Sequence, residues 1–297
     1  WWNCFNSFRL ENIMIKRVVI LLKIGRKLAQ SEILNIFSKF HKIPILIKVL
    51  FYFLSFSFKK KNDVNYNIDD KERLSNSLQS MGTTFIKLGQ FLATRPDIIG
   101  ESLSKQLEKL QDKLPPFPLS DAKAIIKSDL GDQMFNSILN ISEPIAAASI
   151  AQVHKAQIND NGTIKDVAIK ILRPEIKKIF NDEIDALMFF AFILESIVKK
   201  TKRLKLVEVT FLLKQITNHE MDLRFEAAAA NEYAENTKND IGFKVPNIYW
   251  NFTSENVMTL DWIDGNSIRE TEMLESQNID TGKIATDIIQ HFLRHAV

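Results

Sequence analysis

A lysine at the end of a short strand pattern is the first residue in this sequence whose type and position suggest chemistry. Lys170 closes the tetrapeptide VAIK, which begins at Val167 and follows an Asn161-Gly162 turn and an apolar run over 150–158. Asn-Gly between two such runs is a strong signal of a β-hairpin. On its strand Lys170 lies on the face opposite the β-branched side chains. Its ammonium could bind phosphate groups, as in a nucleotide-binding hairpin. The alternative is an ordinary surface hairpin with no ligand.

Four small residues precede the first strand of this hairpin. Ala146, Ala147, Ala148 and Ser149 occupy a position from which a loop could reach the phosphates of a nucleotide near Lys170. Glycines would let the backbone approach phosphates closely, whereas alanines are stiffer and add methyl groups. We therefore expect the phosphates to be placed differently from those beside a glycine-rich loop.

Acidic residues occur together in the later segment EMDLRFE. Glu220, Asp222 and Glu226 fall in a stretch, 209–236, whose pattern predicts one long helix. Asp222 and Glu226 are four residues apart, so both should face one side of that helix. Taken alone, a solvated acidic helix face is the alternative to a functional role for these residues.

A second lysine with a polar neighbour lies in the segment FIKLGQ. Lys87 and Gln90 are three residues apart and should share one face of a helix predicted to begin at residue 74 and to end at Arg95-Pro96-Asp97. An exposed helix edge is the alternative. Another face of the same helix carries an apolar stripe at helical spacing, made of Met81, Phe85, Leu88 and Leu92.

Two histidines could present a metal-binding face. His291 and His295 are spaced i, i+4 on a predicted helix over 282–297. A stable site needs at least a third protein ligand, and the sequence around them offers none that can be recognised. A polar helix edge is therefore favoured, and no metal site is predicted.

The first 61 residues carry a strongly basic charge. They hold 12 Lys/Arg against 2 Asp/Glu, a net charge of +10, whereas residues 62–297 hold 27 against 34, a net charge of −7. The apolar run at 43–58 is interrupted by Lys48, is closed by three lysines at 59–61 and is too short to span a bilayer. Two interpretations stay open: a helix lying on anionic lipid, and a helix packed on the protein body. The single cysteine, Cys4, excludes an intramolecular disulfide.

Together these motifs resemble the UbiB family of atypical kinases, the aarF/ADCK group, which is tied to ubiquinone biosynthesis. The resemblance covers the chain from roughly residue 74 onward and is carried by four blocks in the expected order: FIKLGQ, AAASIAQVH, VAIKILRP and EMDLRFEAAAANEY. It implies that Lys170 holds nucleotide phosphates and pairs with Glu226. It also implies that Lys87 meets the carboxylates of Glu220 or Asp222 across the active-site cleft.

The resemblance further implies an adenine-binding hinge in the segment VMTLDWIDG. Leu260 would be the gatekeeper, and the hinge would run from Asp261 to Ile263. The implied ligand is ATP or ADP with Mg²⁺. The family's catalytic loop and its magnesium-binding aspartate should follow Val297, so we expect a chain that is truncated before them and inactive by itself.

The predicted fold class is α+β: a protein-kinase-like small lobe with a short antiparallel sheet and many added amino-terminal helices, without the large lobe. The predicted domains are a basic apolar arm, family-specific helices, the kinase-like small lobe and the start of a truncated large lobe, at 1–61, 62–140, 141–265 and 266–297.

The predicted function is that of an atypical kinase or ATPase supporting ubiquinone biosynthesis. The alternative is a non-catalytic membrane- or lipid-binding remnant of such a protein. The expected partners are an anionic membrane surface and enzymes or lipid intermediates of ubiquinone biosynthesis, and no nucleic acid is expected. The expected location is the cytoplasmic face of a bacterial inner membrane, with the mitochondrial inner membrane as the alternative.

Overall fold

The computed structural model describes residues 70–296 apart from 109, 111–113, 198, 269 and 278, together with 15, 18–24 and 26. The described residues form two compact units, each built from separate stretches of the chain. The first unit takes the residues up to Pro116, Ala147–Ala151 and Arg173–Met221, and the second takes Phe117–Ala146, Gln152–Leu172 and the residues from Asp222 onward. The domain limits expected from the sequence follow chain order, are not tested by this grouping and stay a prediction.

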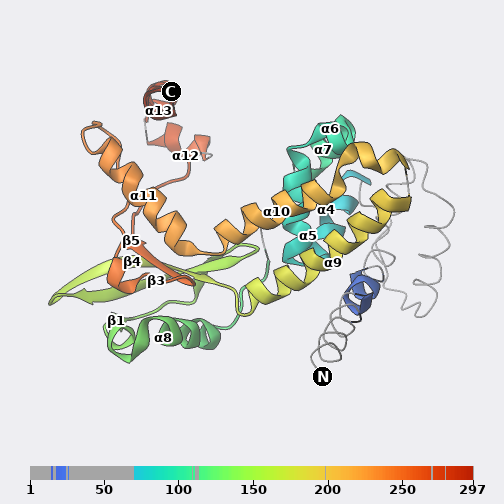
Figure 1. The fold of residues 1–297 in the computed structure, drawn as a ribbon. Helices are drawn as coiled ribbons and strands as arrows, with labels where there is room; N and C mark the ends of the chain where they lie inside the picture. The colour runs from blue at the N-terminus through green and yellow to red at the C-terminus, as the bar shows by residue number, and fades with distance from the viewer. Residues whose placement is uncertain are drawn as a thin grey trace. The chain divides into compact units, whose positions relative to one another are not determined.

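The first unit is helical. Its core is formed by apolar side chains from several helices, among them Phe85, Leu103 and Leu107, and Ile24 of the amino-terminal segment is buried with them. The helices, coloured from cyan to orange in Figure 1, are α4 (Asp70–Met81), α5 (Thr83–Ala93), α6 (Pro96–Ile99), α7 (Glu101–Leu107), α9 (Ile176–Ile197) and α10 (Leu206–Glu220). A 3₁₀ turn, Lys199–Leu204, joins α9 to α10.

The predicted end of the first long helix at Arg95-Pro96-Asp97 is confirmed, because α5 ends at Ala93. Its predicted continuity from residue 74 is wrong, because the chain breaks it at Gly82. This glycine has φ +106°, a value that other residues rarely adopt, and it separates α4 from α5. The predicted apolar stripe is nevertheless directed inward. Met81 and Phe85 are buried, and Leu88 and Leu92 pack against the same core from partly buried positions.

The second unit is built on a sheet. Strand β3 (Ala151–Asp160) pairs with β1 (Ile138–Leu139) and β2 (Pro144–Ala147), and β4 (Thr163–Leu172) continues the sheet to β5 (Val257–Asp261). The β1–β3 and β4–β5 pairs are antiparallel. Helix α8 (Leu119–Asn136) lies along one face of the sheet (Figure 1), where Ala122 and Ile126 join the sheet's buried side chains. Helices with a short antiparallel sheet confirm the predicted α+β class.

The hairpin predicted around Asn161-Gly162 is confirmed. Both residues have positive φ, 51° and 87°, as the tightest hairpin turns require. Along β4, Val167, Ile169 and Ile171 are fully buried, whereas Lys170 between them is not. The alternation that the sequence predicted therefore sets the direction of the lysine.

The long helix predicted over 209–236 is also wrong, because the chain leaves the helical conformation after Glu220. Met221 and Asp222 separate α10 from α11 (Leu223–Thr237). The predicted final helix is confirmed as α13 (Thr281–Ala296). The short α12 (Thr271–Ser276) before it was not predicted. Among the helices that the structure describes, none has the length and hydrophobicity needed to cross a bilayer.

Candidate functional site

Lys170 and Glu226 make a direct ion pair within the second unit. The lysine Nζ lies 2.7 Å from both carboxylate oxygens of Glu226, so the contact expected from the sequence is present. The side chains are 26% and 47% exposed, and a pair this accessible contributes about 0–1 kcal/mol to stability. The pair is therefore better suited to positioning an ammonium than to holding the fold together.

Local backbone contacts place Glu226 opposite the lysine. Asp222 caps α11, with its carboxylate accepting a hydrogen bond from the backbone N–H of Arg224 at 3.1 Å. The Leu223 N–H donates to the Glu255 carbonyl at 3.0 Å. The Leu223 side chain is fully buried. Glu226 then lies in the first turn of α11, where the helix dipole favours a carboxylate.

Asp222 does not have the position that the sequence predicted. It lies outside α11 with extended backbone angles, φ −124° and ψ 100°, so it does not share a helix face with Glu226. Its carboxylate is bound bidentately by the Arg224 guanidinium at 2.9 and 2.7 Å, and this hydrogen bonding raises the pKa of Arg224. An aspartate directly before a helical run is a capping signal, and that signal could have predicted this role.

Lys87 contacts Glu220 within the first unit. The lysine Nζ on α5 lies 2.6 Å from the Glu220 carboxylate at the end of α10, and its side chain is only 12% exposed. The expected contact with Glu220 or Asp222 is thus made to Glu220. Gln90 follows one turn later on α5 and is partly buried.

Gly89, between Lys87 and Gln90, is a residue that the sequence analysis missed. A Cβ at this position would lie 2.6 Å from the Leu110 side chain and 3.0 Å from that of Leu78. Both distances are shorter than ordinary van der Waals contact. The glycine is therefore needed for the close packing that holds α5 in place.

The alanine-rich segment is not a simple loop. Ala146 and Ala147 belong to strand β2, which corrects the expectation of a loop over these residues. Ser149 is fully buried, and its carbonyl accepts a hydrogen bond from the Thr83 hydroxyl at 2.9 Å. Ala146 falls in the second unit and the other three residues in the first, so their arrangement as one phosphate site stays a prediction.

Arg173 is a second residue that the sequence analysis missed. Its guanidinium donates to the Ala148 carbonyl at 2.8 and 3.1 Å and to the Pro115 carbonyl at 3.0 Å. These bonds hold the end of the alanine-rich segment within the first unit. The residue lies in the quoted block VAIKILRP, three positions after Lys170, so attention to that block could have identified it.

The predicted hinge is already hydrogen-bonded at two positions. The Asp261 N–H donates to the Asn247 carbonyl at 3.0 Å, and the Trp262 N–H donates to the Asp166 carbonyl at 3.1 Å. Ile263 is exposed, so it is the hinge residue best placed to meet a base. Leu260, the predicted gatekeeper, lies opposite Ala168 in the β4–β5 register.

The Asp261 side chain stabilises the turn beside this hinge. It accepts hydrogen bonds from the Tyr249 hydroxyl and the Asn247 amide, both at 2.6 Å. Burial opposes its negative charge, but these bonds outweigh that effect and lower the pKa of Asp261. Burial, followed by the bond to Asp261, raises the pKa of Tyr249. The Asp261 carboxylate thus already accepts hydrogen bonds from its neighbours. The role of this hinge in nucleotide binding stays a prediction.

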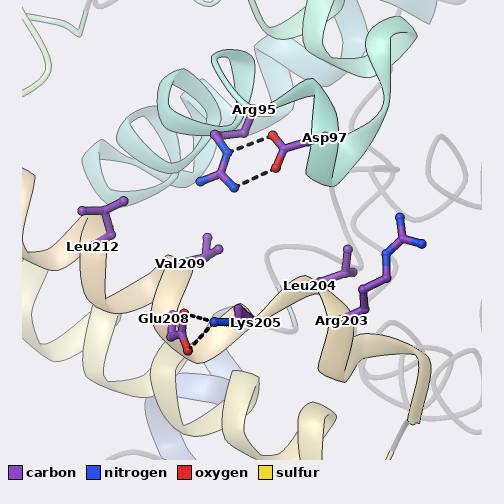
Figure 2. A pocket seen from close by; sticks show the side chains of 8 residues that line it. All are labelled: Arg95, Asp97, Arg203, Leu204, Lys205, Glu208, Val209 and Leu212. Atoms are coloured by element: carbon purple, nitrogen blue, oxygen red, sulfur yellow. Dashed lines mark hydrogen bonds and ion pairs between the residues drawn. The ribbon is translucent and has the colours of Figure 1, made fainter.

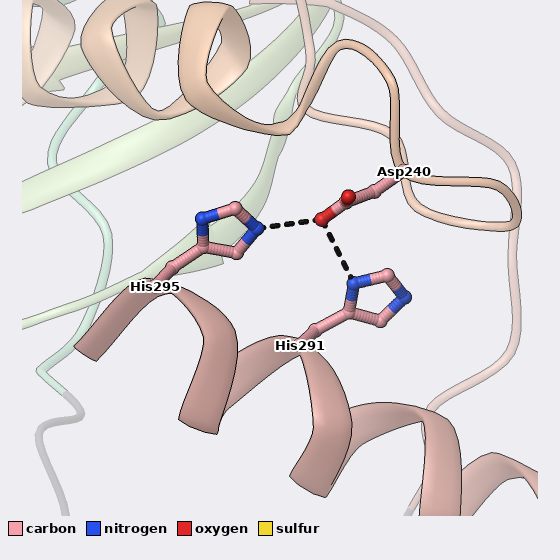
Figure 3. Close-up of side chains that lie close together, drawn as sticks. All are labelled: Asp240, His291 and His295. Carbon is pink, nitrogen blue, oxygen red and sulfur yellow. Dashed lines mark hydrogen bonds and ion pairs between the residues drawn. The ribbon is translucent and has the colours of Figure 1, made fainter. Parts of the chain in front are cut away.

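The two histidines on α13 have a third polar partner. Asp240, which follows α11, lies against both imidazoles (Figure 3). No third ligand could be recognised near the histidines in the sequence, because this aspartate lies 51 positions before His291. The expectation that no third ligand is present is corrected, and the absence of a metal stays a prediction.

One pocket, of about 340 Å³, lies within the first unit. Figure 2 shows that its acidic residues are already paired, Asp97 with Arg95 and Glu208 with Lys205. The remaining lining residues are Arg203, Leu204, Val209 and Leu212. None of the predicted nucleotide-binding residues lines it, and it carries no assigned role.

Comparisons with known proteins point to one family. The family model described as ABC1 atypical kinase-like domain matches residues 109–297. The chain is 33% identical over 222 residues to "Probable protein kinase UbiB" of Marinobacter nauticus, covering 74% of this chain and 40% of that protein. It is 34% identical over 221 residues to the protein of the same name in Azotobacter vinelandii, covering 74% and 41%.

A plant protein shows a similar level of identity. "Protein ACTIVITY OF BC1 COMPLEX KINASE 8, chloroplastic" of Arabidopsis thaliana is 31% identical over 223 residues, 74% of this chain and 29% of that protein. The chain therefore spans about 40% or less of the length of these relatives.

Proposed function

Because the chain belongs to the ABC1/UbiB family of atypical kinase-like proteins, we propose that it supplies the phosphate-anchoring part of a kinase or ATPase that acts in ubiquinone biosynthesis. The observation that carries this proposal is the ion pair between Lys170 and Glu226 at 2.7 Å. Kinases place a strand lysine against a helix glutamate in this way so that the ammonium meets the α- and β-phosphates.

The proposed ligand is ATP or ADP. Lys170 would bind phosphate oxygens, Glu226 would hold the lysine in place, and the hinge backbone near Ile263 would receive the base. Among the described residues, Glu226 is the carboxylate that contacts Lys170, and it is used by that contact. Mg²⁺ therefore does not fit the residues around Lys170, and we derive no step through it.

Nucleotide binding is the direct test. The polypeptide of residues 1–297 should be labelled weakly by a photoreactive ATP analogue, and Lys170→Ala should abolish the labelling. The matched control is Lys165→Ala, on the same strand, whose ammonium pairs with Asp160 at 2.8 Å. Labelling that survives Lys170→Ala, or that falls equally in both variants, would contradict the proposal.

A second candidate function, membrane or lipid binding, is favoured by the amino-terminal segment. Ile15, Val18, Val19 and Leu22 recur at helical spacing and are exposed, whereas Ile24 is buried in the core of the first unit. An apolar helix face on a segment with a net charge of +10 fits an anionic lipid surface. The run at 43–58, on which the membrane prediction also rests, lies outside the described residues.

This charge also supports the proposed location. Basic segments are attracted to the negative surface of the cytoplasmic leaflet, so we place the protein on the cytoplasmic face of a bacterial inner membrane. The mitochondrial inner membrane remains the alternative. Proposed partners are the anionic bilayer and the enzymes or lipid intermediates of ubiquinone biosynthesis.

A further inference from the structure

Asp240, His291 and His295 bring three metal-ligating side chains together within the second unit. The Asp240 Oδ2 atom lies 2.5 Å from the His295 Nε2 and 3.2 Å from the His291 Nδ1. All three ligand atoms lie within 4.8 Å of one another. Figure 3 shows both imidazoles directed from consecutive turns of α13 toward the same carboxylate oxygen.

The carboxylate is held by a fourth residue that would not touch an ion. Arg294 donates to the other oxygen of Asp240, Oδ1, at 2.6 Å. This bond leaves Oδ2 for the imidazoles and fixes the orientation of the carboxylate, as outer-shell partners of metal ligands do. The Arg294 side chain is 58% exposed, so solvent screens much of its positive charge.

The imidazoles are held by ring contacts. His291 packs against Phe243 with ring centroids 4.9 Å apart, and His295 packs edge-on against Tyr233 at 5.9 Å. Tyr233 and Phe243 also contact each other edge-on at 5.5 Å. The Asp240, His291 and His295 side chains are only 8%, 13% and 15% exposed. The cluster is thus shielded and partly pre-organised before any ligand binds.

We propose that Asp240, His291 and His295 form a binding site for a divalent transition-metal ion of the zinc type. Two imidazole nitrogens and one carboxylate oxygen are a ligand set that zinc accepts, with the fourth position left to water or an exogenous ligand. Bond lengths of about 2.0–2.2 Å place tetrahedral ligand atoms about 3.3 Å apart. The Oδ2–His291 separation already matches this spacing, and the Oδ2–His295 contact must lengthen by less than about 1 Å.

The site would link two elements of the second unit. Asp240 belongs to the turn that follows α11, and both histidines lie in the last turns of α13. Helix α11 carries Glu226 near its other end. A bound ion would therefore fasten α13 to the helix that positions the partner of Lys170.

Metal binding can be measured directly on the 297-residue chain. Zn²⁺ affinity is determined by competition with a chromophoric chelator, and Co²⁺ reports coordination through its visible absorption. The expected result is one ion per chain. Asp240→Asn, His291→Ala and His295→Ala should each weaken binding by roughly tenfold or more, because even outer-shell partners contribute tenfold. The matched control, His219→Ala on α10, should bind as the unmodified chain does.

A further variant separates a metal site from a metal-free ion-pair cluster. Arg294→Ala removes the guanidinium but keeps all three ligands. A metal site should still show a Zn²⁺-dependent rise in melting temperature in this variant, reduced because an outer-shell partner is lost. It should lose that rise in Asp240→Asn. Absence of saturable Zn²⁺ or Co²⁺ binding, or equal binding by all variants, would overturn the proposal. An increase in melting temperature that persists in Asp240→Asn would do the same.

Discussion

The Lys87–Glu220 and Lys170–Glu226 ion pairs differ in how much water surrounds the lysine. Lys87 is 12% exposed and Lys170 is 26% exposed, so Lys170 is the more accessible of the two cations. Both partner glutamates are substantially exposed, which keeps each pair's contribution to folding small. Lys170 is thus the better placed of the two to meet a phosphate while Glu226 holds it in position.

Gly89 gives a prediction at the scale of one residue. Gly89→Ala should destabilise the protein, because the new methyl group must displace Leu110 and Leu78, which are both buried. Overpacking costs about 1–3 kcal/mol, and the better helix propensity of alanine offsets about 1 kcal/mol. The net loss of roughly 1 kcal/mol should lower the melting temperature.

The control for this change is Gly265→Ala, where a Cβ meets nothing within 4 Å. It should leave the melting temperature nearly unchanged. If Gly89→Ala were as stable as Gly265→Ala, the close packing assigned to Gly89 would be wrong.

The placement of a side chain could be predicted from the sequence where it depends on the pattern of neighbouring residues. The direction of Lys170 follows from strand alternation and from a turn whose residues adopt positive φ. Both signals come from residues close to Lys170 in the sequence. Asp240 could not be found in the same way, because its approach to His291 depends on packing between segments 51 positions apart. Arg173 was missed because a lone arginine after a strand has many possible acceptors, and its contacts to Ala148 and Pro115 exist only in the folded unit.

At the scale of helices and strands, the errors have a common physical cause. Periodicity predicted one continuous helix from residue 74 to Arg95-Pro96-Asp97 and another over 209–236, but each is interrupted by one or two residues with non-helical angles. An interruption this short barely changes the spacing of apolar residues, so the sequence on either side still shows the periodicity of one continuous helix. Gly82 and Asp222 were the local signals of the two breaks, the first as a flexible backbone position and the second as a helix cap.

The amino-terminal segment carries a prediction at the same scale. The 297-residue chain should sediment with anionic vesicles, and deletion of residues 14–61 should abolish this binding, since the deletion removes the basic charge and the apolar face. Because Ile24 is part of the core of the first unit, a milder variant is needed as well. Reversal of the charges at Lys59, Lys60 and Lys61 to glutamate should weaken binding while sparing that core.

Ionic strength and lipid composition provide the controls for vesicle binding. Binding should fall with added salt, which screens surface charges, and should be weak on neutral vesicles. Sedimentation that is unchanged after deletion of 14–61 would show that another surface binds lipid or that no specific binding occurs.

For the molecule as a whole, the proposed function asks which part of a phosphoryl-transfer site these residues would supply. Lys170 and Glu226 are the proposed phosphate anchor and pair within the second unit, and Lys87 and Glu220 form another ion pair within the first. No sequence resembling the family's catalytic loop occurs within the 297 residues. Phosphoryl transfer also needs groups that orient the nucleophile and hold the metal. The anchor alone should therefore bind nucleotide without turning it over.

The last prediction follows from this division of roles. The polypeptide of residues 1–297 should not hydrolyse ATP above background, because positioning a phosphate does not stabilise the transition state without the remaining charges. A chimera that joins it to the part of the Marinobacter nauticus relative beyond the matched region should gain ATPase activity, measured as phosphate release. Lys170→Ala in the chimera should abolish the gain, whereas Lys165→Ala should retain most of it. Robust turnover by the 297-residue polypeptide alone, lost in Lys170→Ala, would mean that it already holds a complete site and that the division of roles argued here is wrong.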